Sequence, residues 1–178
     1  MSSQRNDQAI ITTIAQTMGI PLSSIEARYD ETGNLIDLAL SHLGLTYLPS
    51  EIGQLTYLER LYLNRNYFNA LPPEIGRLTR LKLLGLSNNS LPALPPEIGQ
   101  LTCLERLYLN DNQLTTIPPE IARLVSLTLL GLNGNRLSFL PPEIGQLVGL
   151  TLLDLRNNPL DSLPAEIGQL VNCYIQMK

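Results

Sequence analysis

The chain has 178 residues, 44% of them hydrophobic, and a formal net charge of −4. The length suits one domain, and the acidic balance argues against a nucleic-acid partner, whose binding surface would carry a basic stripe. Because no apolar run is long enough to span a bilayer and no charged-then-apolar signal segment opens the chain, we expect a cytoplasmic protein without a membrane partner. Export from a bacterium is the alternative.

Residues 1–34 predict a helix followed by a hairpin, which we interpret as an N-terminal cap. Gly19 and Pro21 end the helical pattern, so we expect the helix over residues 5–18. Two extended runs around a turn at residues 30–33 predict the hairpin. The apolar residues that share one helical face are Ile10, Ile11, Ile14, Ala15 and Met18.

Residues 35–172 repeat one 23-residue frame, LxxLxLxxNxLxxLPxEIxxL, six times without insertion or deletion. A fixed period of this length predicts a solenoid of stacked units that share one core. The frame has Leu or Ile at seven apolar positions in every repeat, apart from Phe68. The repeats open at Leu35, Leu58, Leu81, Leu104, Leu127 and Leu150.

The frame also predicts local structure. The alternating LxL at positions 4–6 is typical of a short strand, and strands of successive repeats must run parallel. The asparagine at position 9 can satisfy backbone groups of the buried turn that follows. The LPPEIG segment begins a short helical turn, where proline lacks the N–H that would have no partner. We therefore expect an α/β solenoid: a right-handed horseshoe arc with one parallel strand per repeat on the concave face and helical or 3₁₀ turns on the convex face.

This frame, LxxLxLxxNxLxxLPxEIGxL, resembles the leucine-rich repeat, in the 23-residue class of Ras-suppressor-like, plant Ras-group-related and bacterial proteins. The resemblance implies a non-enzymatic scaffold for protein–protein interaction, without cofactor or catalytic residues, and signalling partners such as small GTPases or phosphatases. Two alternatives stay open. One is a regulatory or sensing domain of a larger protein, and the other is a bacterial secreted factor that binds host proteins.

Four residues interrupt the frame or carry reactive groups. In the first repeat Leu43 replaces the asparagine, and we expect the cap to satisfy that turn in another way. His42 has no second ligand at metal spacing, so we expect a surface residue at the concave rim and no metal site. Cys103 and Cys173 lie three repeats apart, too far for a disulfide.

The concave face should be lined by positions 2, 3, 5, 7 and 8, where Tyr alternates with Gly and Arg with Leu. One explanation is duplication of a two-repeat block. The other is a corrugated binding surface with Tyr62 and Tyr108 about 10 Å apart and a glycine dip between them. The predicted partner-binding residues are Glu59, Arg60, Tyr62, Arg65, Lys82, Leu83, Glu105, Arg106, Tyr108, Asp111, Leu129, Asp154 and Arg156. Their balanced charges, together with Asp37, favour a protein partner of mixed surface charge over nucleic acid.

Residues 173–178 depart from the frame and alternate Cys173, Ile175, Met177. We interpret them as a terminal strand or truncated repeat. An open strand edge is a template for another strand, so we expect weak self-association through it.

Overall fold

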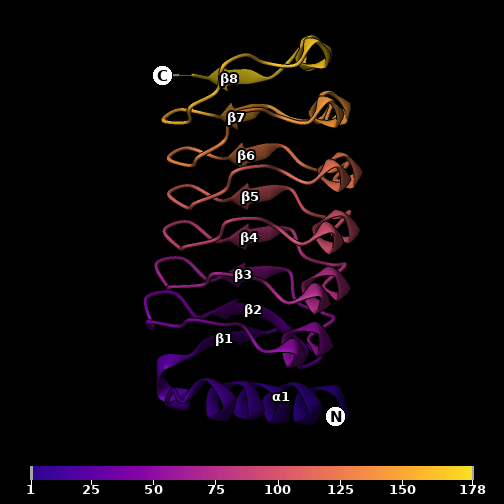
Figure 1. The fold of residues 1–178 in the computed structure, drawn as a ribbon. Helices are drawn as coiled ribbons and strands as arrows, with labels where there is room; N and C mark the ends of the chain where they lie inside the picture. The colour runs from indigo at the N-terminus through magenta and orange to yellow at the C-terminus, as the bar shows by residue number, and fades with distance from the viewer. Residues whose placement is uncertain (1, 178) are drawn as a thin grey trace.

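The computed structural model describes residues 2–177, and side chains from residue 6; Met1 and Lys178 of the predicted cap and terminal strand lie outside this part. Helix α1 (Ser2–Met18) is followed by one sheet whose strands lie in chain order. Figure 1 shows the strands stacked above α1, with the helical turns along one side. The strands are β1 (Glu26–Tyr29), β2 (Leu35–Ala39), β3 (Arg60–Tyr62), β4 (Leu83–Gly85), β5 (Arg106–Tyr108), β6 (Leu129–Gly131), β7 (Leu152–Asp154) and β8 (Tyr174–Gln176).

The parallel array confirms the predicted solenoid. Strands β2 to β8 pair in parallel, each with the strand of the next repeat, whereas β1 pairs with β2 antiparallel as the predicted hairpin. Each LPxEI segment forms a five-residue 3₁₀ turn, such as Pro96–Gln100. The preceding prolines have φ near the value that their ring imposes, for example −69° at Pro95.

The seven apolar columns form one continuous core. In the interior repeats these side chains are almost fully buried: Leu61, Leu84 and Leu107, the middle residues of β3 to β5, are 0% exposed. The same columns lose cover in the last repeat, where Leu160, Leu163 and Ile167 are only partly buried. Burial of each repeat therefore depends on the next one, as expected of a stack in which units too small to hold a core share one.

The asparagine at position 9 joins two neighbouring turns. Asn112 donates from Nδ2 to the carbonyl of Leu109 in its own repeat, at 3.1 Å, and to Leu86 of the preceding repeat, at 2.9 Å. Its Oδ1 accepts from the backbone N–H of Leu91, also in the preceding repeat, at 3.1 Å. Because the side chain is buried, these bonds satisfy backbone groups that water does not reach.

The same geometry explains why the first repeat has no such asparagine. Its turn is completed from the second repeat: Asn66 Oδ1 accepts from the N–H groups of Leu43, at 3.1 Å, and Leu45, at 3.0 Å. The expectation that the cap satisfies this turn was wrong. Each amide reaches back by one repeat, so the first repeat receives an amide and has no earlier repeat to serve.

Helix α1 contacts the first repeat through its apolar face. Ile10, Ile11 and Ile14 are between 1% and 5% exposed and belong to the continuous core. The buried carboxylate of Asp7 accepts from the backbone N–H of Leu35 at 2.8 Å. The predicted helix is present and extends to Ser2, and Gly19 follows it with φ of +68°. The boundary at residue 34 between cap and repeats stays a prediction.

The predicted terminal strand is present as β8, but with a shift in register. Leu152 pairs with Tyr174, a separation of 22 residues, whereas the preceding pair, Leu129 with Leu152, is 23 residues apart. The shift brings Ile175 opposite Leu153 and against the core. Within the described residues β7 is the only strand beside β8. Self-association through this edge stays a prediction.

In five of the six repeats a glycine follows the convex isoleucine, whereas the fourth has Ala122. These glycines allow close stacking, and we expect Gly99→Ala to destabilise the protein. A Cβ on Gly99 would lie 2.5 Å from the carbonyl oxygen of Glu120 in the next repeat. Overpacking of this kind costs about 1–3 kcal/mol, which thermal denaturation would detect. Gly168→Ala, at the same position of the last repeat, meets nothing within 4 Å and should leave the melting temperature unchanged. Equal melting of both variants would contradict the close contact.

Candidate functional site

The concave face consists of the residues on either side of the buried middle residue of each strand. In β3 the inward residue is Leu61, and Arg60 and Tyr62 point outward; β5 repeats this with Leu107, Arg106 and Tyr108. The parallel register places equivalent positions side by side, so two outward rows cross the sheet. One row contains Asp37, Arg60, Leu83, Arg106, Leu129 and Leu152, and the other Ala39, Tyr62, Gly85, Tyr108, Gly131 and Asp154.

Five charged groups at the N-terminal end of the face are already paired with each other. Asp37 Oδ1 accepts from Arg60 Nε at 2.6 Å and its Oδ2 from an Arg60 terminal nitrogen at 2.9 Å, while Arg28 of β1 also binds Oδ2. Lys82 Nζ lies 3.0 Å from Glu59. Arg60 was predicted to bind a partner, but Asp37 already occupies the two guanidinium nitrogens that could bind a partner carboxylate.

A shallow pocket lies at this N-terminal end of the face. Its volume is about 270 Å³, and the ring of Tyr62 forms one wall beside Arg28 and Asp37. The side chains of Glu26, Ala27 and Ala39 complete the lining. Arg28 and Asp37 bind each other, whereas Glu26 enters no ion pair within the described residues, so the pocket keeps one unpaired acidic group.

The expected glycine dip between the two tyrosines is filled. Gly85 is buried, and a Cβ on it would lie 2.7 Å from Nδ2 of Asn64. Gly131 stands in the same relation to Asn110, at 2.9 Å. The alternation therefore has a packing reason: an asparagine side chain at position 7 lies over the glycine of the following repeat. The corrugated surface that the sequence suggested is flatter than expected.

The outward leucines differ from one another. Leu83 is only 7% exposed, so its predicted place on the binding surface was wrong. It lies between Arg60 and Arg106, whose aliphatic stems can cover it. Leu129 and Leu152, which are neighbours in the same row, stay partly exposed.

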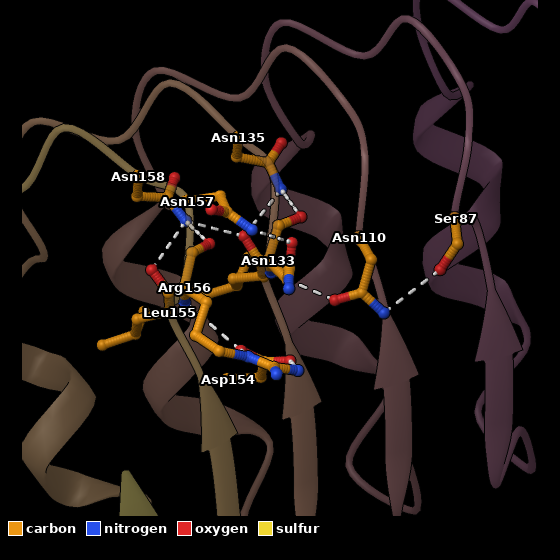
Figure 2. Close-up of polar contacts among 10 residues, drawn as sticks. Ser87, Asn110, Asn133, Asn135, Asp154, Leu155, Arg156, Asn157 and Asn158 are labelled. Atoms are coloured by element: carbon orange, nitrogen blue, oxygen red, sulfur yellow. Dashed lines mark hydrogen bonds and ion pairs between the residues drawn. The ribbon is translucent and has the colours of Figure 1, made fainter. Parts of the chain in front are cut away.

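Polar side chains at positions 7 and 8 form the rim of the face beyond the carboxyl ends of the strands (Figure 2). Asn110 donates to Ser87 Oγ at 3.5 Å and accepts from the backbone N–H of Asn133 at 3.0 Å, and Asn157 donates to Asn133 at 3.2 Å. The residue at position 8 adopts a left-handed conformation, with φ of 54° at both Arg65 and Asp111. Both side chains are exposed at this rim.

The last predicted pair, Asp154 and Arg156, forms a two-point ion pair at the same rim. Arg156 Nε donates to Asp154 Oδ1 at 2.9 Å, and a terminal nitrogen to Oδ2 at 2.7 Å. These bonds lower the pKa of the Asp154 carboxyl below its usual value and raise the pKa of Arg156. Of the charged residues predicted on the face, Glu105, Arg106, Arg65 and Asp111 enter no ion pair within the described residues.

The structure also reveals an exposed row that sequence reasoning missed. One residue per repeat, after the last apolar position of the frame, faces solvent on the flank where the 3₁₀ turn leads into the next strand. Val125, Val148 and Val171 are between 68% and 82% exposed. Their recurrence at one repeat spacing was the available signal. The complete row is Thr56, Thr79, Thr102, Val125, Val148 and Val171.

The remaining expectations concern single side chains. His42 is exposed shortly after the end of β2, with φ of 63°. Cys103 and Cys173 are free thiols, the first exposed and the second partly buried. Nowhere between residues 2 and 177 do three His, Cys, Asp or Glu side chains gather closely enough to hold a metal ion. Over the same residues, the structure has no helix of the length and apolarity that a bilayer crossing requires.

Comparison with known proteins adds to this geometry. A family model described as a leucine-rich repeat region matches residues 26–113, and one described as a leucine rich repeat matches residues 102–160. None of the curated proteins matches the chain.

The solved structures that are similar to it include the following two. An LRR protein of Leptospira interrogans has a TM-score of 0.65 and 36% identity, over 79% of this chain and 43% of that one. A plant ice-binding protein has a TM-score of 0.80 and 28% identity, over 93% of this chain and 60% of that one. The chain therefore spans about half the length of these proteins.

Proposed function

Because the chain is a leucine-rich-repeat protein, with two such models matching residues 26–160 in combination, we propose that it is a protein-binding module that holds a partner protein on its concave sheet. Leucine-rich-repeat domains generally mediate protein–protein interaction. The observation that carries the proposal is the middle of the face, where Arg106 and Tyr108 lie side by side on β5 and stay accessible. Tyrosine and arginine are enriched at the energetic centres of protein interfaces.

The chemistry of the face favours a protein over other partners. The face carries both acidic and basic side chains, and several of them pair with each other, so the face does not attract a uniformly charged polymer. A protein surface of mixed charge can be held in register by complementary pairs. We propose that such a partner contacts the two tyrosines, Tyr62 and Tyr108, whose rings offer large area at small entropic cost. A role in signalling, as a regulatory domain of a longer chain or as a secreted factor would use this same surface.

The experiment is a selection of binders from a phage-displayed peptide library on the immobilised chain, followed by affinity measurements on variants. Tyr108→Ala should weaken the selected binders about thirtyfold, the usual loss at an interface centre, and Tyr62→Ala should weaken those that reach β3. Glu97→Ala, on the convex 3₁₀ turn, is the control and should change nothing. Binders that are indifferent to both tyrosines, or that require Glu97, would refute the concave-face proposal.

A further inference from the structure

The number of charged side chains near the beginnings of the strands falls abruptly along the stack. Four positions surround the beginning of each strand: positions 22 and 23 of the preceding repeat, and positions 2 and 3 on the concave face. Around β3, β4 and β5 these positions include Glu59, Arg60, Arg80, Lys82, Glu105 and Arg106. Around β6 and β7 they carry no charge, and comprise Val125, Ser126, Thr128, Leu129, Val148, Gly149, Thr151 and Leu152. An uncharged strip therefore runs from the flank onto the concave face.

This strip is apolar at its surface. Val125 and Val148 are 69% and 68% exposed. Thr128 and Thr151 are also exposed, but their hydroxyl groups donate to the backbone carbonyls of Glu105, at 3.0 Å, and Thr128, at 2.9 Å. Since these hydroxyl hydrogens are used within the sheet, the threonines offer a partner chiefly their methyl groups. Contiguous apolar surface of this kind is typical of interaction sites.

Arg106 stands at the border of the strip without a counter-charge. Its neighbours in the row are Leu83 and Leu129, and it enters none of the ion pairs of the described residues. Glu105, which precedes it in the chain, also enters none of these ion pairs. Arg106 therefore lacks an acidic partner at this border.

We propose that the uncharged strip, defined as Val125, Thr128, Leu129, Val148, Thr151 and Leu152, docks an apolar protein segment that carries one carboxylate, which binds Arg106. This deepens the function proposed above and rests on it. A guanidinium between apolar neighbours is well suited to a two-point bond with a carboxylate, and apolar contact on either side would exclude water from that bond. The N-terminal end of the face, where Asp37 pairs with Arg60 and Glu59 with Lys82, plays no part in this contact.

The test uses three fluorescently labelled twelve-residue peptides of leucine, valine and serine that differ only in one central residue: Asp, Lys or Asn. Fluorescence anisotropy with the full chain should show tightest binding of the Asp peptide. Arg106→Glu should reverse the preference in favour of the Lys peptide, because like charges then meet in the Asp complex. Val148→Lys should weaken the Asp peptide about tenfold or more by placing a hydrated charge on the strip.

Thr79→Lys is the matched control. It introduces the same side chain at the same exposed position of the N-terminal half and should leave the affinity unchanged. Equal affinities for the three peptides, absence of binding, or wild-type affinity of Val148→Lys would overturn this inference. If library-selected binders depend on Tyr62 or Tyr108 but are indifferent to Arg106 and Val148, only the strip fails. If they ignore both tyrosines, the proposed function itself fails.

Discussion

Leu107→Asp should unfold the centre of the stack. Leu107 is the middle residue of β5, is 0% exposed, and lies between Leu84 and Leu130 of the neighbouring strands. An aspartate there would bury a carboxylate among leucines with no charged or polar partner. Such substitutions belong to the few mechanisms that cost more than about 4 kcal/mol. We expect urea denaturation, followed by circular dichroism, to show a large fall in midpoint or a chain that is already unfolded.

Arg106→Asp is the control for this prediction. It places the same carboxylate one residue earlier on the same strand, where the side chain is exposed. Its cost should stay within about 1 kcal/mol, the span of strand propensities. Comparable stability of the two variants would mean that β5 has its inward and outward residues reversed. The stability of this variant also shows whether a substitution of Arg106 can weaken peptide binding while the fold stays intact.

The sequence predicted the fold well because its information is periodic. A buried leucine at a fixed interval specifies strand, face and register together, since a slip by one residue would expose the whole apolar set. Among the parallel pairs of the described residues the register slips only before β8, and the alternation of Cys173, Ile175 and Met177 signalled it. The strand there was predicted, but its pairing of Leu152 with Tyr174 was not.

The face was less predictable, because its properties arise between repeats. Whether an outward leucine is exposed depends on the residues 23 positions away on either side: Leu83 lies between two arginines and is covered, whereas Leu129 has an arginine on one side only. Likewise Gly85 was predicted to form an open dip, but the side chain of Asn64 lies over it. Such contacts require the stacked structure, although the residue types alone indicate which positions face outward.

The N-terminal cap gives the last prediction: removal of residues 1–22 should cause aggregation. Ile11 and Ile14 of α1, at 3% and 1% exposed, cover the apolar end of the first repeat, and Asp7 satisfies the backbone N–H of Leu35 at 2.8 Å. Without the helix, that apolar end and the backbone group lose their cover. A terminal repeat that lacks a cap is an aggregation site.

Static light scattering on the purified truncation would measure this, with Ile14→Asp as a full-length variant that disrupts the same contact. Ile14→Asp should lower the melting temperature and raise the scattering, because it buries a charge against the first repeat. Thr13→Asp, on the exposed side of the same helix, should behave as the unaltered chain, since a surface change there costs within about 0.5 kcal/mol. A truncation that stayed monomeric and fully folded would show that the first repeat is stable without α1.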